Sequence, residues 1–266
     1  QVPDGVYRGL IQKNGQSLKD ADILYIEVSQ KDFPNSHSRM EVLGTKLHAV
    51  KRVEIEKQGS ALKIEEKLIK SNSKDRSAPH CKMKYDLTFD SLTGYLSGTY
   101  VSLDCKRNVG KVVLYRTDEK FNFDEEPTNT HYFQHQLVRA IERGFPAPEV
   151  LEEKRMSFQF KPILFDHDES IIRQEYHEYL KEMAILLDAI HDLRVKVTGH
   201  TDAVGTDAYN IGLSERRAAA IIAFFADLGI ESDKLEMDFK GERQPVDDNT
   251  TPEGKQRNRR VDFKFI

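Results

Sequence analysis

Apolar and polar residues alternate through the first 117 residues of this chain, and the alternation then stops. A period of two is typical of strands with one face in a core and the other in water. Breaks such as Lys13-Asn14-Gly15 and Asn108-Val109-Gly110 separate the alternating runs. The pattern predicts an antiparallel β meander of about eight strands, closed as a barrel or folded as a sandwich. The expected strands are 6–11, 23–30, 40–44, 50–57, 61–68, 83–90, 95–103 and 111–116.

The two cysteines of the chain, Cys81 and Cys105, flank the predicted hairpin 83–103. In an antiparallel hairpin, the residue numbers of every pair add to the same total. A two-residue turn that pairs Leu92 with Tyr95 gives a total of 187, and the numbers of Cys81 and Cys105 add to 186. One bulge would bring the two sulfur atoms together. We therefore predict a cross-strand disulfide, which contributes about 3 kcal/mol and forms in an oxidising compartment. The alternative is a pair of buried free thiols in a cytosolic protein.

Residues 118–154 read as an acidic linker that contains a short amphipathic helix at 130–143. The apolar stripe of this helix consists of Phe133, Leu137, Val138 and Ile141. Within it, His131 and His135 stand four residues apart and could share a metal ion. Because no third ligand accompanies them, we expect two surface histidines and no metal or other cofactor.

The last part of the chain, residues 155–266, alternates between strand and helix patterns. Strands are expected at 156–165, 193–198, 235–240 and 260–265, and helices at 170–190 and 207–228. The order β-α-β-α-β-β predicts a sheet covered by helices. Together with the β meander, it makes the whole chain an α+β protein of two domains.

The charge is distributed unevenly along the chain. Residues 1–117 hold 20 basic and 14 acidic residues, a net charge of +6, whereas residues 118–266 hold 20 and 30, a net charge of −10. An acidic second half without a dense Lys/Arg run argues against nucleic acid as a ligand. No apolar run approaches the roughly 20 residues of a membrane-spanning helix. The start at Gln1, without Met or a leader, fits a mature form whose export signal has been removed, and a trimmed chain would look the same.

Three spaced motifs near the end of the chain identify a family. They are Gly199-His200-Thr201-Asp202, then Leu213-Ser214-Glu215-Arg216-Arg217-Ala218, then Asn258-Arg259-Arg260-Val261, with Gly241, Pro245, Asn249 and Gly254 between the last two. In this order and spacing they resemble the OmpA-like C-terminal domain. The resemblance covers roughly residues 155–266 and leaves residues 1–117 unmatched.

The resemblance implies non-covalent binding of peptidoglycan through the diaminopimelate of its stem peptide, with Asp202 and Arg217 as the ligand-holding pair. The residue types suit this role. A free amino-acid terminus offers an ammonium group to the Asp202 carboxylate and a carboxylate to the planar fork of the Arg217 guanidinium. Asp202 follows a Val-rich strand and Arg217 lies two to three turns into the next helix, so the chain can fold back and bring them together. The alternative is an internal Asp202–Arg217 salt bridge without a ligand.

Further positions around this pair are candidates by analogy with the family. Thr201 and Leu213 are expected on the pocket wall, and Phe165, Asp166 and Asp168 on its rim. The two aspartates could equally cap a helix that begins near Ile171. Asn210 is expected to support the loop, and Asn258, Arg259 and Arg260 are expected to be architectural or surface residues. Ala203 and Val204 replace polar residues of many relatives, which predicts fewer peripheral contacts.

No Gly-x-Ser-x-Gly, His-Glu-x-x-His or P-loop motif occurs in the chain, so we predict a binding protein and not an enzyme. The main hypothesis is a periplasmic, outer-membrane-associated tether, in which the C-terminal domain holds the cell wall and residues 1–117 engage an envelope protein partner. The alternative is an envelope carrier or enzyme whose β domain binds a small ligand, with the C-terminal domain serving only localisation.

Overall fold

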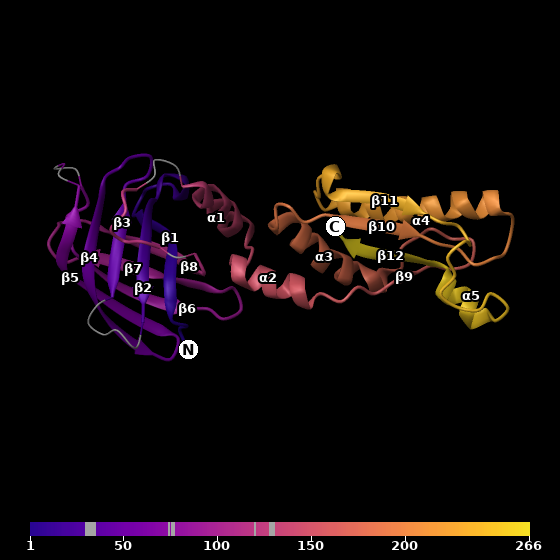
Figure 1. The fold of residues 1–266 in the computed structure, drawn as a ribbon, viewed down its shortest axis with the longest axis horizontal. Coiled ribbons are helices and arrows are strands. Elements are labelled where there is room, and N and C mark those ends of the chain that lie inside the picture. The colour runs from indigo at the N-terminus through magenta and orange to yellow at the C-terminus, as the bar shows by residue number, and fades with distance from the viewer. Residues whose placement is uncertain (30–35, 74, 76–77, 120, 128–130) are drawn as a thin grey trace. The chain divides into compact units, whose positions relative to one another are not determined.

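The computed structural model describes residues 1–29, 36–73, 75, 78–119, 121–127 and 131–266. The chain forms two compact units, Gln1–Glu152 and Glu153–Ile266 (Figure 1). The position of one unit relative to the other is not determined, and each is described by itself.

The first unit contains a closed barrel of eight antiparallel strands in chain order (Figure 1). Each strand pairs with the next, and β1 and β8 pair to close the barrel. All eight strands that the alternation predicts are present, but the third, expected at 40–44, lies at His37–Glu41. Gln30, the end of the second prediction, lies outside the described residues. The strands are β1 (Gly5–Lys13), β2 (Asp22–Val28), β3 (His37–Glu41), β4 (His48–Gln58), β5 (Ala61–Asn72), β6 (Met83–Phe89), β7 (Tyr95–Ser102) and β8 (Val109–Thr117).

Apolar side chains from all eight strands form one buried cluster in this unit. Its largest members are Tyr7, Tyr85 and Tyr100, each at most 1% exposed. Burial alternates along the strands, as in β6, where Met83, Tyr85 and Leu87 are buried and the residues between them are exposed. The alternation in the sequence therefore indicates which side chains face the inside of the barrel and which face outward.

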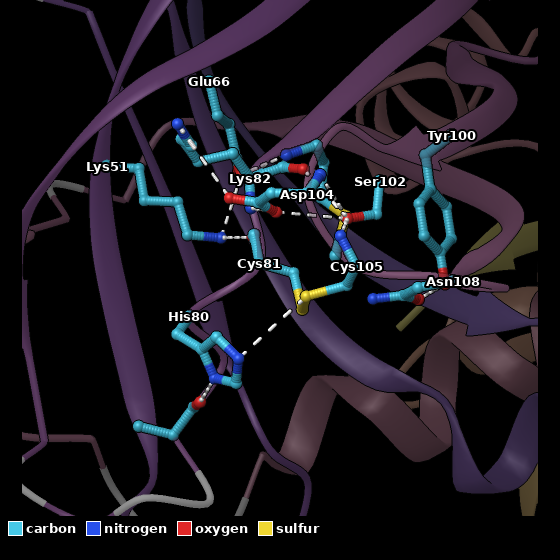
Figure 2. Close-up of a disulfide and its surroundings, with 12 residues drawn as sticks. Lys51, Glu66, His80, Cys81, Lys82, Tyr100, Ser102, Asp104, Cys105 and Asn108 are labelled. Carbon is cyan, nitrogen blue, oxygen red and sulfur yellow. Dashed lines mark hydrogen bonds and ion pairs between the residues drawn. A yellow bond between two sulfur atoms is a disulfide. The ribbon is translucent and has the colours of Figure 1, made fainter.

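The predicted disulfide between Cys81 and Cys105 is present, with the two Cα atoms 5.7 Å apart (Figure 2). The predicted two-residue turn is wrong: paired residues of β6 and β7 sum to 185, not 187. The Asp90 amide donates to the Tyr95 carbonyl, 2.9 Å away, which leaves four residues in the turn. The Asp90 carboxylate accepts hydrogen bonds from the Leu92 amide and the Thr93 hydroxyl. Leu92 is thereby held in the turn and not in the strand.

The segment expected to be a linker contributes two helices, α1 (Tyr132–Arg143) and α2 (Pro148–Ser157). The predicted helix 130–143 is confirmed from Tyr132 onward, and Thr130 lies outside the described residues. Its apolar stripe packs against the outer side of the barrel, in a second cluster that includes Leu10, Ile23, Tyr25, Tyr95 and Tyr115. Most of the segment therefore belongs to the first compact unit.

The second unit contains a four-stranded mixed sheet in the order β11-β10-β12-β9. β10 (Val195–Gly199) lies at its centre, parallel to β11 (Leu235–Phe239) and antiparallel to β12 (Arg260–Phe265), which also pairs with β9 (Ile163–Leu164). The helices are α3 (His177–Ala189), α4 (Asp207–Asp227) and α5 (Pro252–Asn258), and α4 contacts β10, β11 and β12. With the barrel, this sheet and its helices confirm the α+β class.

Two local predictions in this unit are wrong, and one helix was not predicted. The strand expected at 156–165 is reduced to the two residues of β9, because α2 continues to Ser157 and Pro162 has no N–H for a ladder. The helix expected from residue 170 begins at His177, after a 3₁₀ turn at Gln174–Tyr176. Helix α5 was not expected. It begins with a Thr251 cap and Pro252 in its first turn, which are standard start signals, but it is only 7 residues long.

Candidate functional site

The candidate site begins where the central strand β10 ends. The His200 amide donates to the Arg260 carbonyl at 2.8 Å, and the Thr201 amide donates to the Gly241 carbonyl at 2.9 Å. Gly199 is required before them, because a Cβ there would lie 2.0 Å from the Ser214 carbonyl oxygen of α4. The backbone of β10 therefore packs directly against α4, and the residues that follow, including Asp202, are directed beside this helix.

The Asp202 side chain is buried and paired with an arginine. One carboxylate oxygen, Oδ2, lies 2.8 Å from Nη1 of Arg259, and the other accepts from the Val204 amide at 3.2 Å. His167 approaches Oδ2 to 4.0 Å from the exposed side. Asp202 as a whole is only 4% exposed. The closest cation to Asp202 is thus Arg259, which the motif analysis treated as architectural, and not Arg217.

Arg217 is fully buried and joins three backbone segments. Its Nε donates to the Glu169 carbonyl at 2.8 Å, Nη1 to the His200 carbonyl at 2.9 Å, and Nη2 to the Asp166 carbonyl at 3.0 Å. Burial lowers the pKa of Arg217 to about 10, and the negative charge of Asp202 opposes that shift. Asp202 and Arg217 are both buried and close enough for their charges to interact. However, no Asp202–Arg217 ion pair forms in the described part of the chain.

The two predicted wall residues lie beside this pair. Thr201 is 1% exposed, and its hydroxyl oxygen has no hydrogen-bond partner among the described residues. Leu213 is 5% exposed and stands one helical turn before Arg217 on α4, hence on the same face. An unpaired buried hydroxyl is costly unless something binds to it. Thr201 and Leu213 thus provide one polar and one apolar surface next to the buried charges.

The three predicted rim residues differ in environment. Phe165 is fully buried, with the Arg217 guanidinium 5.4 Å from the centre of its ring. Asp166 is exposed and pairs with Arg173, which lowers the pKa of its carboxyl group. Asp168 is exposed, has a left-handed backbone with φ of 61°, and accepts from the Tyr209 hydroxyl. The alternative in which these aspartates cap the next helix is wrong, because α3 begins at His177.

The Asn258 side chain shapes the loops around Asp202. It is completely buried, accepts from the amides of Val246 and Asp247, and donates to Asn249 at 2.9 Å. Asn249 in turn accepts from the Ala203 amide at 3.2 Å. Asn258 is therefore architectural, as expected, and it connects the loop before α5 to the residue after Asp202. Asn210 also supports a loop, by donating to Glu242.

The histidines considered for metal binding do not converge. His131 is buried, with Nε2 at 3.0 Å from Glu41 of the barrel, whereas His135 is exposed. Among the described residues, the grouping with metal-ligand spacing is His80, Cys81 and Cys105, whose two sulfur atoms are bonded to each other. In neither place does the structure offer the three or four free ligands of a protein metal site.

Comparison with known proteins identifies the second unit. Residues 164–259 match the OmpA family. The chain is 32% identical over 136 residues to the outer-membrane lipoprotein YfiB of Pseudomonas aeruginosa, a match that covers 51% of this chain and 79% of that protein. This chain belongs to the OmpA family. The matched residues include all the candidate ligand-binding residues, from Phe165 to Arg217.

Other matches to the OmpA-family domain include a protein whose name states a ligand. The peptidoglycan-binding protein ArfA of Mycobacterium bovis is 35% identical over 102 residues, 38% of this chain and 31% of that protein. A solved structure, the peptidoglycan-associated lipoprotein of Burkholderia pseudomallei, is 26% identical with a TM-score of 0.39, and the match covers 40% of this chain and 90% of that one. The chain spans only 12% to 66% of the first curated relatives that it matches.

A membrane-spanning helix is not found among the described residues: none of their helices has the required length and apolar character.

Proposed function

We propose that the OmpA-family domain binds peptidoglycan non-covalently and thereby holds the chain at the cell wall, in the periplasm and associated with the outer membrane. The similarity to a relative named as peptidoglycan-binding supports the ligand, and the similarity to a relative named as an outer-membrane lipoprotein supports the location. The names of these relatives describe binding and envelope proteins, which favours a binding role over catalysis. The disulfide is consistent with an oxidising compartment.

The chemical group that the site recognises, in this proposal, is the zwitterionic end of diaminopimelate. The observation that carries the proposal is the buried Asp202 carboxylate, held by Arg259 at 2.8 Å in the electrostatic field of Arg217. A ligand ammonium group takes the place of the Arg259 contact on Asp202. A buried carboxylate prefers a cationic partner, so Asp202 stays paired in this exchange, and Arg259 keeps its hydrogen bonds to the Phe165 carbonyl and the Gln256 side chain.

In the same proposal, Arg217 binds the carboxylate group at the zwitterionic end of diaminopimelate. A guanidinium group has five N–H bonds, and three of those of Arg217 are used by backbone carbonyls, so two remain for a ligand. The unpartnered Thr201 hydroxyl supplies a further polar contact, and Leu213 packs on the aliphatic part of the diaminopimelate. Asp166 and Asp168 form the rim that faces the rest of the peptide, and the fully buried Phe165 lies against the Arg217 guanidinium.

The test is the binding of the full chain to purified sacculi, with Asp202→Asn as the decisive variant. Asparagine keeps the size of the side chain and removes its charge. We expect at least about 30-fold weaker binding, equivalent to about 2 kcal/mol for loss of one partner of a buried charge pair. Asp227→Asn, an exposed aspartate in the last turn of α4, is the matched control and should bind normally.

Two further measurements make this test specific. A thermal melt of Asp202→Asn must show a folded protein. The variant Arg217→Ala is a weaker test, because it removes three hydrogen bonds to the backbone and can itself disturb folding. Muropeptides with diaminopimelate should compete with sacculi, and muropeptides with lysine, which lacks the second carboxylate, should compete poorly. Sacculus binding by folded Asp202→Asn at wild-type strength contradicts the site, and equal competition by both muropeptides contradicts the diaminopimelate assignment.

For the first unit we propose an interaction module that engages an envelope protein partner. The supporting observation is that apolar side chains from all eight strands pack together in the barrel, which favours a filled interior over a carrier cavity. Crosslinking of the full chain in native cells, followed by mass spectrometry, tests this proposal. Crosslinks from the barrel to one recurrent envelope protein are expected, and a co-purifying small molecule without such crosslinks would support the carrier alternative.

A further inference from the structure

A hollow of about 440 Å³ lies in the second unit, away from Asp202. It is formed by the end of α2, the segment after it and the outer side of α3. Its volume is within the range of small-molecule sites, roughly 300–1,000 Å³. None of its lining residues belongs to the peptidoglycan site proposed above.

The hollow and the Asp202 site lie at opposite ends of the central strand. Phe158 of the hollow packs against Phe265 with ring centres 5.6 Å apart, and Phe265 pairs with Val195 at the start of β10. Asp202 follows the end of the same strand, after Gly199. A ligand in the hollow is therefore separated from Asp202 by the length of β10, about 13 to 17 Å for five residues.

One wall of the hollow is aromatic and aliphatic. The rings of Phe158 and Tyr179 stack with centres 5.6 Å apart and an angle of 23° between their planes. Ile185, on the same side of α3, leaves 45% of its surface exposed, and Leu186 lines the hollow from a buried position. Tyr179 is held in place by the hydrogen bond that its hydroxyl oxygen accepts from the Lys161 amide, 2.9 Å away. The wall is thus a fixed apolar surface with access to solvent.

The charges around this wall are two lysines and one glutamate, Lys154, Lys161 and Glu182. Neither lysine forms an ion pair in the described part of the chain, although residues 118–266 carry ten more acidic than basic residues. Elsewhere in this unit lysines do pair: Lys181 lies 2.6 Å from Glu178, and Lys196 lies 3.0 Å from Glu236. Two unpaired ammonium groups beside an apolar wall are suited to an anion with an apolar body.

We propose that this hollow binds a small anionic amphiphile, which carries one carboxylate or phosphate group on an apolar chain or ring. The apolar part lies on Phe158, Tyr179 and Ile185, and the anionic group lies between Lys154 and Lys161. Lysine acts as a point charge without the two-point geometry of arginine, so the site accepts either head group. This site is independent of the peptidoglycan proposal, since it shares no residue with it.

The test is a titration of the full chain, labelled at isoleucine and leucine methyl groups, followed by NMR. The probes are decanoate and monodecyl phosphate, each below its critical micelle concentration, and uncharged decanol, below its solubility limit. Both anions should shift the Ile185 and Leu186 methyl signals saturably, and decanol should bind at least about tenfold more weakly. The stronger of the two anions identifies which head group the site prefers.

Variants separate a specific site from general apolar binding. Combined Lys154→Ala and Lys161→Ala should weaken decanoate binding about tenfold, and Glu182→Gln should strengthen it about threefold, because a repelling charge is removed. Lys181→Ala, on the same helix and outside the lining, is the control and should leave the affinity unchanged. Sacculus binding should be normal in every variant. The proposal is overturned if decanol binds as well as decanoate, if loss of both lysines has no effect, or if neither anion moves the Ile185 signal.

Discussion

Individual buried side chains in the OmpA-family domain have electrostatic environments that set the pH response of its folding. His200 is 2% exposed, its Nδ1 has no partner among the described residues, and Nε2 lies 3.4 Å from Asp262. Burial, with a contribution from the nearby charge of Arg260, lowers the pKa of His200 from 6.5 to about 4. The folded protein therefore holds this imidazole neutral at a pH where the unfolded chain protonates it.

This shift predicts a loss of stability in acid. Between pH 6.5 and 4 the unfolded chain binds a proton at His200 that the folded chain does not, so the free energy of unfolding falls as the pH falls through this window. Between pH 7 and 4.5 the loss is roughly 2–3 kcal/mol from this residue. Thermal melts across this range compare the wild type with His200→Gln, which lacks the titrating group. A variant that loses as much stability as the wild type would show that other groups dominate.

At the scale of elements, a disulfide links the two ends of the β6–β7 hairpin, and a buried ion pair ties the hairpin to the neighbouring strands (Figure 2). Lys51 lies 2.9 Å from Glu66 and donates to the Cys81 carbonyl at 2.6 Å. Glu66 also accepts from the Met83 amide and the Ser38 and Tyr85 hydroxyls. These contacts offset the cost of burying two charges, and they hold the chain where Cys81 enters the hairpin.

Removal of the disulfide should destabilise the first unit measurably. The disulfide joins two residues that are 24 positions apart in the sequence. Because it restricts the conformations of the unfolded chain, a loop of this length adds about 3 kcal/mol to the free energy of unfolding. Cys81→Ser combined with Cys105→Ser should lower the free energy of unfolding by that amount in urea titrations. Reductant should lower the wild type equally and leave the double variant unchanged. If the double variant is as stable as the oxidised wild type, the loop is already constrained in the unfolded chain.

At the scale of the whole molecule, the chain consists of two compact units with separate cores. The first has the barrel core, to which α1 is attached from outside, and the second has its own sheet around β10. Residues 1–152 hold 23 basic and 22 acidic residues, a net charge of +1, and residues 153–266 hold 17 and 22, a net charge of −5, so the acidic excess lies in the second unit. Separate cores favour separate cooperative unfolding.

We therefore expect two unfolding transitions in calorimetry of the full chain. Reduction of the Cys81–Cys105 bond should shift mainly the transition of residues 1–152, and His200→Gln in acid should shift mainly that of residues 153–266. Hydrogen exchange at intermediate temperatures assigns each transition to its unit. A single transition that responds equally to both changes would mean that the units unfold together.

Much of the architecture could be predicted from residue patterns. Alternation located all eight barrel strands because their two faces differ in burial, and the cysteine positions led to the correct disulfide. Predictions of strand and helix bounds from residue periodicity were less reliable where a local contact or a proline sets the backbone conformation. Asp90 lengthens the hairpin turn, Pro162 shortens β9, and the 7-residue α5 is too short to show an apolar period. The motif located Asp202 and Arg217, but nothing in their spacing showed that Arg259 is the ion-pair partner of Asp202.

Residue patterns were enough to predict the fold class, the disulfide and the family, because burial periodicity and motif spacing are properties of the chain order. Which donors and acceptors meet became visible in the folded protein. The three carbonyls on Arg217 come from residues up to 51 positions away, and Arg259 is 57 positions from Asp202. The hollow beside Lys154 and Lys161 is likewise lined by residues that are distant in the sequence, from Lys154 to Leu186. Such contacts depend on how the elements pack, and packing is set by all the side chains together.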